Sequence, residues 1–354
     1  MPASAYGLLH DGLYCARIAS LVSERAGSGS TVWFQIAGRC IVVDIRHESL
    51  RSALDAVPLP LHEAGAPVHA SAALRLTLTS SEDLPGHVAD ARLADGTALT
   101  IPASPEIGTP VELLVCSDGA TFICDGHGVA TVSADGTEAE VIVAEPTSLA
   151  AGALVASVVL ATAAEFGFSP VHASLADRDE RAVMFCGERS MGKSSSCMAL
   201  ARAGWTVRAD DRCYVHTCDG DTMVWGAGGS ISLRPGAANL WPDLQQAMQQ
   251  KPPETVKHVV KADEVGGRAE AGSVRCDALL FPTVIGEGPH RIEPIPRADA
   301  LPDLLFTTGL AAIPAHAALH FRHLTALVEQ TPCYRMELGR DMDALPAAIG
   351  EALE

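Results

Sequence analysis

The stretch CGERSMGKSSS, residues 186–196, constrains the fold of this 354-residue chain more than any other feature. The spacing G-x-x-x-x-G-K-[ST] is met by Gly187, Gly192, Lys193 and Ser194. An apolar run at 181–186 predicts a strand before the loop, and the residues after it predict a helix ending at Gly204. Successive backbone N–H groups and the positive end of a helix together favour a bound anion. The sequence therefore predicts a phosphate-binding loop inside an α/β fold, rather than an accidental glycine turn.

The side chains of this loop predict a bound nucleotide and a metal ion. In such loops the lysine reaches the β- and γ-phosphates and the following hydroxyl ligates Mg²⁺, roles that fall here to Lys193 and Ser194. Lys193 is one of only four lysines in the chain. The nucleotide-contacting residues are expected to be Gly187, Glu188, Arg189, Ser190, Met191, Gly192, Lys193, Ser194 and Ser195.

A pair of carboxylates follows in the apolar segment VRADDRCYV, which predicts a second strand with Asp210 and Asp211 in its middle or at a bulge. A carboxylate among apolar residues needs a partner. Beside a phosphate loop, one aspartate can hold Mg²⁺ and the other can accept a hydroxyl proton, as phosphoryl transfer requires. The alternative is a structural ion pair with Arg208 or Arg212.

These motifs, in this order, resemble the HPr kinase/phosphorylase family. The match covers about 168–354: PVHASL, the loop, a short helix ending in ARAG, and the Asp-Asp pair 17 positions after the loop lysine (210 − 193). That family shares its nucleotide fold with ATP-dependent phosphoenolpyruvate carboxykinase. The tail is also similar to smaller HPr-kinase-related proteins of peptide-maturation clusters, including lasso-peptide kinases.

The resemblance implies roles for individual residues. Lys193 and the loop would bind ATP, Ser194 and Asp210 would bind Mg²⁺, and Asp211 would act as the base, although the two aspartates could exchange roles. His172 matches the family's histidine near the reacting phosphoryl group, whereas a lone histidine in an apolar strand is by itself more often structural. Arg212 would contact phosphate or pair with Asp210.

Two departures from the family pattern limit what is carried over. The family loop usually reads G-x-S-G-x-G-K-[ST], and Arg189 and Ser190 stand here in place of its serine and second glycine. Without glycine the turn could be strained, because only glycine adopts a positive φ cheaply. The glycine-rich signature of bifunctional HPr kinase/phosphorylases is also missing after the pair, which leaves phosphorylase activity and HPr as a partner in doubt.

The chain divides by texture into a β-rich domain, 1–145, and an HPr-kinase-like ATP-binding domain, 146–354. In the first, short β-branched runs alternate with Asp-Gly turns at 95–96, 118–119, 125–126 and 135–136, which predicts antiparallel hairpins. Its role is open. Ser148 is a candidate N-cap for an apolar helix at 149–165, too short to span a bilayer. The segment 245–273 is expected to be exposed.

Composition excludes some partners. A net charge of −18 argues against nucleic acid, and we expect no membrane partner either. No secretory signal is visible at the N-terminus and the ten cysteines show no C-x-x-C pair, so we expect free thiols in the cytoplasm. The resemblance leaves a homo-oligomer possible.

Other candidate sites are weaker. His316, His320 and His323 share a helix face at i, i+4 and i+7, but no H-E-x-x-H pattern supports a metal site. Four cysteines could bind a metal, although buried thiols fit better: Cys186, Cys197, Cys213 and Cys218. Lys257 and Lys261 either close over the nucleotide or are ordinary solvated side chains, and Arg234 could reach a phosphate.

The sequence thus predicts an ATP- and Mg²⁺-dependent kinase that phosphorylates a hydroxyl, expected to be a serine of a peptide or small protein. Two alternatives remain. The acceptor could be a small-molecule alcohol, or the altered loop could bind nucleotide without turnover in an accessory or sensory protein.

Overall fold

The computed structural model describes most of the chain between residues 24 and 353. Before residue 119 it describes 24–26, 29–36, 39–51, 62–63, 74–81, 84, 97–101 and 111–116. After that point the gaps are 146–148, 189, 235, 238–239, 245–257 and 309–315. Within the described residues the chain forms two compact units, an N-terminal unit (Leu9–Phe168 and Leu310–His320) and a C-terminal unit (Ser169–Gly309 and Phe321–Glu354).

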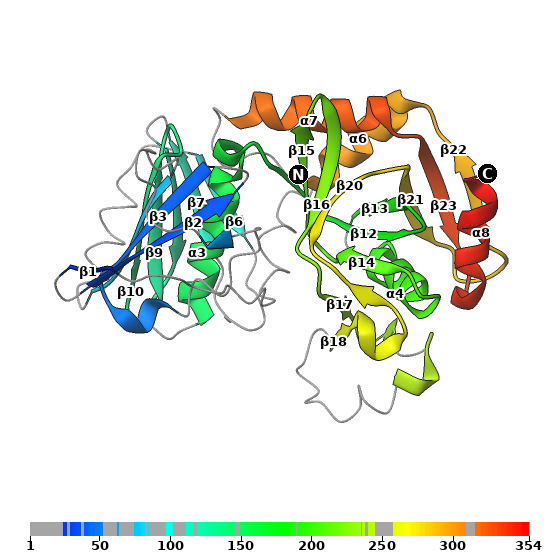
Figure 1. The fold of residues 1–354 in the computed structure, drawn as a ribbon, viewed down its shortest axis with the longest axis horizontal. Coiled ribbons are helices and arrows are strands. Elements are labelled where there is room, and N and C mark those ends of the chain that lie inside the picture. Colours follow the sequence, from blue (N-terminus) through cyan, green and yellow to red (C-terminus); the bar gives the residue numbers. More distant parts are fainter. Residues whose placement is uncertain are drawn as a thin grey trace. The chain divides into compact units, whose positions relative to one another are not determined.

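The N-terminal unit is built on a ten-stranded sheet, drawn from blue through cyan to blue-green in Figure 1. Its strands are β1 (Glu24–Ala26), β2 (Gly29–Ile36), β3 (Arg39–Ile45), β4 (His62–Glu63), β5 (Leu74–Ser80), β6 (Thr97–Ile101), β7 (Val111–Cys116), β8 (Gly119–Cys124), β9 (Gly128–Ser133) and β10 (Glu138–Val143). They lie in the order β1-β2-β3-β5-β10-β9-β8-β7-β6, with β4 paired to β2.

The expected hairpins form where the structure describes them. The turns at 125–126 and 135–136 join β8 to β9 and β9 to β10, both antiparallel pairs. Gly126 and Gly136 take φ values of 73° and 72°, which only glycine adopts without strain. Asp95, Gly96 and Asp118 lie outside the described residues.

The apolar helix expected at 149–165 is confirmed as α3 (Leu149–Thr162), continued by the short helix η3 (Ala163–Phe166). It packs on the sheet so closely that a Cβ on Gly128 would lie 2.6 Å from Leu154 Cδ1. The N-terminal unit therefore extends past residue 145 to include this helix. None of the helices in the described part of the chain has the length and apolarity that crossing a bilayer requires. Ser148, its candidate N-cap, lies outside the described residues.

The C-terminal unit confirms the expected mixed α/β class. Its main sheet has seven strands in the order β19-β14-β12-β13-β21-β23-β22. These are β12 (Ala173–Arg178), β13 (Arg181–Cys186), β14 (Thr206–Ala209), β19 (Arg268–Ala269), β21 (Ala278–Val284), β22 (Arg291–Pro294) and β23 (Cys333–Leu338). The helices are α4 (Lys193–Arg202), α6 (Arg297–Thr308), α7 (Ala317–Gln330) and α8 (Leu345–Ala352).

The two faces of this sheet bury separate cores, which Figure 1 shows as helices on opposite sides of β13 and β21. Alternate residues of β21 point to opposite faces, as a strand requires. Leu280 packs with Met198 of α4 and Ile349 of α8. Leu279 packs instead with Leu304 of α6 and with residues of α7. The main sheet is therefore the middle of three layers.

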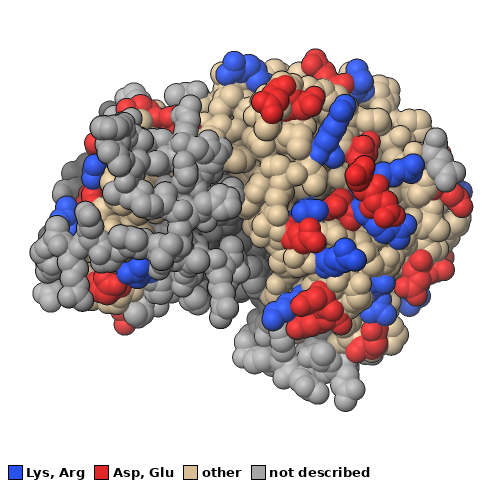
Figure 2. Space-filling view, in the orientation of Figure 1, with Lys and Arg blue, Asp and Glu red and all other residues tan. Residues whose placement is uncertain are grey.

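Two smaller sheets complete the C-terminal unit. One has the order β11-β15-β16-β20, and the other pairs β17 with β18. Their bounds are β11 (Ser169–Val171), β15 (Cys213–Cys218), β16 (Asp221–Gly226), β20 (Gly272–Arg275), β17 (Ser230–Leu233) and β18 (His258–Lys261). The described part of 245–273 thus forms strands, whereas the sequence suggested only an exposed segment. Over the visible face of this unit, acidic and basic side chains are interspersed (Figure 2).

His323 of α7 gives the C-terminal unit a pH-dependent stability. Its Nδ1 lies 2.9 Å from Ser169 Oγ, and burial, with His216 and Arg322 nearby, lowers the His323 pKa to about 4. The unfolded side chain titrates near 6.5, so protons bind preferentially to the unfolded state between the two values. Stability should therefore be lost as the pH falls from about 6.5 to about 4.

We expect His323→Gln to remove about 2 kcal/mol of this pH dependence between pH 7 and pH 5. Urea unfolding followed by tryptophan fluorescence at both pH values measures the effect, because Trp205, Trp225 and Trp241 lie in this unit. Parallel losses of stability in the wild type and the variant would contradict the assignment to His323.

Candidate functional site

The loop of the predicted phosphate-binding motif, called the phosphate loop below, lies between a strand and a helix, as the sequence predicted. Strand β13 ends at Cys186 and helix α4 begins at Lys193, with residues 187–192 between them. The helix ends at Arg202, and Gly204 follows with a φ of 83°. The predicted strand at 181–186 and the helix before Gly204 are thus confirmed. The N-terminal N–H groups of α4 are directed toward the loop, as anion binding requires.

Gly192 and Ser190 both give the loop backbone a positive φ. Gly192 has a φ of 101°, and a Cβ there would lie 2.4 Å from Leu338 Cδ1. Ser190 has a φ of 68°, at the position where the family that the sequence resembles carries glycine. The sequence-based expectation of strain at this position has its physical basis here, because an L-residue in this region loses about 1–2 kcal/mol. Arg189 lies outside the described residues.

The loop lysine folds back over the loop. Lys193 is buried, with 5% of its surface exposed, and its Nζ donates to the carbonyl oxygens of Gly187 at 2.7 Å and Glu188 at 2.9 Å. A buried ammonium group needs such acceptors. Ser194 and Ser195 are half-buried in the first turn of α4, and Met191 is half-buried before it. Lys193 and Ser194 are therefore the first two residues of the helix, at its N-terminus.

The aspartate pair lies close to this helix. Cys197 of α4 contacts the residue that precedes the pair: its Sγ lies 3.9 Å from the carbonyl oxygen of Ala209. Burial raises the Cys197 pKa well above its usual value, and Asp210 and Asp211 raise it further. The aspartate pair thus lies near the helix that begins at Lys193.

The pair does not lie inside one strand. Strand β14 ends at Ala209 and β15 begins at Cys213, and the two belong to different sheets. The chain turns between them with Asp211 at a φ of 70°. Apolar residues on both sides made VRADDRCYV resemble one continuous strand, but the structure breaks it at the aspartates.

Asp210 is fixed through both of its carboxylate oxygens. Ser174 Oγ donates to Oδ1 at 2.5 Å, and the backbone N–H of Ser232 donates to Oδ2 at 2.7 Å. Ser174 is fully buried on β12, and Ser232 lies on β17. Neither serine was singled out from the sequence. Ser174 follows His172 by two residues in the sequence, and this spacing was the only available signal. In the structure His172 lies between β11 and β12, and Ser174 lies on β12.

His172 lies beside the turn that carries the pair. Its ring is 4% exposed, and its Nδ1 donates to the carbonyl oxygen of Asp211 at 2.8 Å. A carbonyl oxygen can only accept, so Nδ1 carries the hydrogen and the lone pair of the neutral ring lies on Nε2. Residues 172 and 210–212 both connect the seven-stranded sheet to the four-stranded sheet, through the pairs β12–β14 and β11–β15.

The structure gives less information on the basic side chains that the sequence analysis named as candidates. Arg212 is buried and adjoins Tyr214, where it opposes the rise in the tyrosine pKa that burial causes. Arg234 is half-buried, two residues beyond Ser232. Lys261 is exposed on β18, and Lys257 lies outside the described residues.

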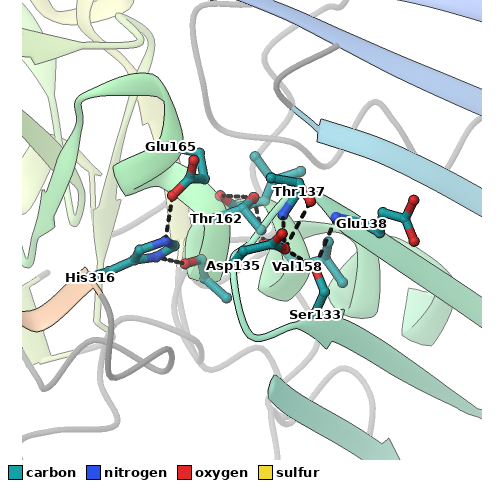
Figure 3. Close-up of polar contacts among 10 residues, drawn as sticks. Ser133, Asp135, Thr137, Glu138, Val158, Thr162, Glu165 and His316 are labelled. Carbon is teal, nitrogen blue, oxygen red and sulfur yellow. Dashed lines mark hydrogen bonds and ion pairs between the residues drawn. The ribbon is translucent and has the colours of Figure 1, made fainter. Parts of the chain in front are cut away.

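The histidine and cysteine candidates form no metal site in the structure. His316 lies in the N-terminal unit, with Nε2 2.7 Å from Glu165 Oε1 and Nδ1 3.1 Å from the Ala161 carbonyl oxygen (Figure 3). His320 is buried as well, and His323 contacts Ser169. Cys218 is exposed, whereas Cys186, Cys197 and Cys213 are buried free thiols. Among the described residues, no three His, Cys, Asp or Glu side chains converge on one metal position.

Comparison with known proteins gives matches to solved structures and no sequence match. No family model matches the chain, and no curated protein matches it. Its structure is similar to that of the HPr(Ser) kinase/phosphatase from Coxiella burnetii, with 12% identity and a TM-score of 0.28, over 52% of this chain and 95% of that one. At this identity and TM-score the likeness does not extend to activity or substrate.

The strain at Ser190 can be tested directly. We expect Ser190→Gly to raise the free energy of unfolding by about 0.5–1 kcal/mol, because glycine adopts a φ of 68° without steric cost. Ser195→Gly is the matched control inside α4, where glycine should lower stability by about 0.5 kcal/mol. Urea unfolding measures both. Equal losses in the two variants would show that residue 190 does not have a positive φ.

Proposed function

We propose that this chain is an ATP- and Mg²⁺-dependent kinase of the HPr-kinase-like kind, with the nucleotide fold shared with phosphoenolpyruvate carboxykinase. One observation carries the proposal. A phosphate loop with a buried lysine lies at the same end of the sheet as an aspartate held by hydrogen bonds. The helix after the loop contacts the strand before the aspartate, because Cys197 of α4 lies against the carbonyl oxygen of Ala209. Phosphoryl transfer needs these parts together: a cradle for the phosphates, a cation, a metal ligand and a base.

The residues present fit a nucleotide and its metal. The loop backbone leaves no room for a side chain at Gly192, and Lys193 already holds its ammonium group between two carbonyl oxygens of the loop. Mg²⁺ is usually bound by one or two protein oxygens, with phosphates and water completing the shell. Ser194 and Asp210 would be these protein ligands. The ion would neutralise charge on the phosphate oxygens.

Asp211 would accept the proton of the attacking hydroxyl, and Asp210 would orient the metal. Because Ser174 and Ser232 donate to Asp210, its carboxylate is favoured in the ionised form that a metal ligand needs. His172 would hold the turn that carries Asp211 through its bond to the backbone carbonyl. The acceptor is proposed, from the family resemblance, to be a serine of a peptide or small protein.

Transfer from γ-labelled ATP with Mg²⁺ to candidate peptides tests the proposal. We expect Lys193→Ala and Asp211→Asn each to lower the rate about 100-fold or more, because they remove charge stabilisation and the base. Asp219→Asn is the matched control, an exposed aspartate that also has a positive φ, of 52°. It should leave the rate unchanged.

The same assay separates the two alternatives. Label transferred to a small alcohol, and not to peptides, would replace the acceptor class while keeping the kinase. Tight ATP binding with no product that depends on Lys193 or Asp211 would overturn the kinase proposal. The protein would then be a nucleotide-binding accessory protein, as the altered loop allows.

The support for Asp210 gives a separate prediction. Ser174→Ala removes the donor to Oδ1, so we expect kcat to fall about 10-fold with a smaller change in the KM for ATP. Ser169→Ala is the matched control, because it also removes one hydroxyl contact from a buried serine, to His323 instead. If both variants lose stability equally and neither changes kcat, Ser174 is only structural.

A further inference from the structure

Two apolar side chains beside the phosphate loop are unusually exposed. Val284 and Ile285, at the end of β21, are 56% and 42% exposed. In the described part of the chain, Phe321 of α7 is the other large apolar side chain with such exposure, at 50%. Apolar surface of this kind gains free energy when it is covered. We call Val284 and Ile285 the apolar shelf.

The backbone that carries the shelf is pinned to the end of β23. The N–H groups of Ile285 and Gly286 both donate to the carbonyl oxygen of Leu338, at 3.0 and 3.3 Å. His290 closes the loop, since its Nδ1 accepts from the N–H of Gly339 at 3.2 Å and its Nε2 donates to the Asp341 carbonyl oxygen at 2.5 Å. These hydrogen bonds thus fix the backbone of the shelf while the side chains of Val284 and Ile285 stay exposed.

The shelf also adjoins the phosphate loop directly. A Cβ on Gly192 would lie 3.4 Å from Val284 Cγ2, besides its clash with Leu338. Gly192 is the residue before Lys193, at the start of α4. The shelf therefore begins where the loop ends.

The order of strands places the shelf and the aspartate pair on opposite flanks of the loop. Strand β13 is parallel to β21, and β21 is parallel to β23. Strand β12 is antiparallel to both β13 and β14, so β14 runs parallel to β13. The carboxyl ends of these strands therefore lie at one edge of the sheet. Along it, the aspartates after β14 come first, then the loop after β13, then the shelf after β21.

We propose that the apolar shelf binds the base of the nucleoside triphosphate. This inference rests on the proposed function, because the transferred phosphoryl group must point toward Asp211 and the acceptor hydroxyl. A phosphate chain lying in the loop then directs its nucleoside to the other flank, where Val284 and Ile285 lie. The flat face of a base is apolar, and branched aliphatic side chains pack well against it. The shelf offers little besides contact area, so it would recognise a base mainly by shape.

Titration calorimetry with Mg²⁺ tests this with two probes, ATP and inorganic tripolyphosphate. We expect Val284→Ser with Ile285→Ser to raise the Kd for ATP about 10-fold or more, while the Kd for tripolyphosphate changes less than about 2-fold. Lys193→Ala should weaken both probes. Phe321→Ser is the matched control, which removes an equally exposed apolar side chain from α7 and should change neither Kd.

Each other outcome overturns the inference in a distinguishable way. Unchanged ATP affinity in the double variant would show that the shelf does not bind the base, and it would leave the kinase proposal intact. If the KM for an acceptor peptide rises instead, the shelf binds the acceptor. If sedimentation shows a wild-type dimer that the double variant loses, a second copy covers the shelf. Failure of the wild type to bind both probes would overturn the proposed function itself. Circular dichroism of the double variant confirms that it is folded.

Discussion

The carboxylate of Asp210 is the interaction on which the candidate site depends. It joins three strands that are distant in sequence, because Ser174 of β12 and Ser232 of β17 both donate to an aspartate that follows β14. Even a half-buried carboxylate is costly to desolvate unless such donors satisfy it. Once satisfied, it fixes the end of β14 against its neighbours and holds the adjacent Asp211 at the turn. The hydrogen-bond partners of Asp210 therefore also set the position of Asp211.

Backbone conformation contributes a second constraint. Ser190 and Asp211, one in the loop and one in the pair, are both non-glycine residues with a positive φ. Asparagine and aspartate tolerate this region better than most residues, whereas serine does so at a cost. Strained residues persist where the surrounding structure holds them, and they are concentrated at functional sites. Here one position lies in the loop before α4 and the other in the turn after β14.

The sequence predicted best what depends on neighbouring residues. The strand at 181–186, the loop and the helix up to Gly204 follow from an apolar run, a glycine pattern and a helix stop, all of which are local. The prediction of one strand through Asp210 and Asp211 was wrong because tertiary structure divides this segment. The residues before the pair join one sheet and the residues after it join another. Ser174 and Ser232 could not be found, since only the fold brings them to Asp210. The use of residues 258–273 in strands was missed for the same reason.

The phosphate loop itself illustrates why a local motif is not sufficient. Its glycines allow the turn, but Gly192 is placed by Leu338 and Val284, which come from strands much later in the chain. Strand β23 in turn holds the residues after Val284, because the N–H groups of Ile285 and Gly286 donate to the carbonyl oxygen of Leu338. The loop is therefore supported on one flank by β21 and β23 and faces the aspartates on the other. In the nucleotide site that we propose, the phosphate chain would lie between two flanks of different chemistry, one apolar and one acidic. This asymmetry would favour a single direction of the chain.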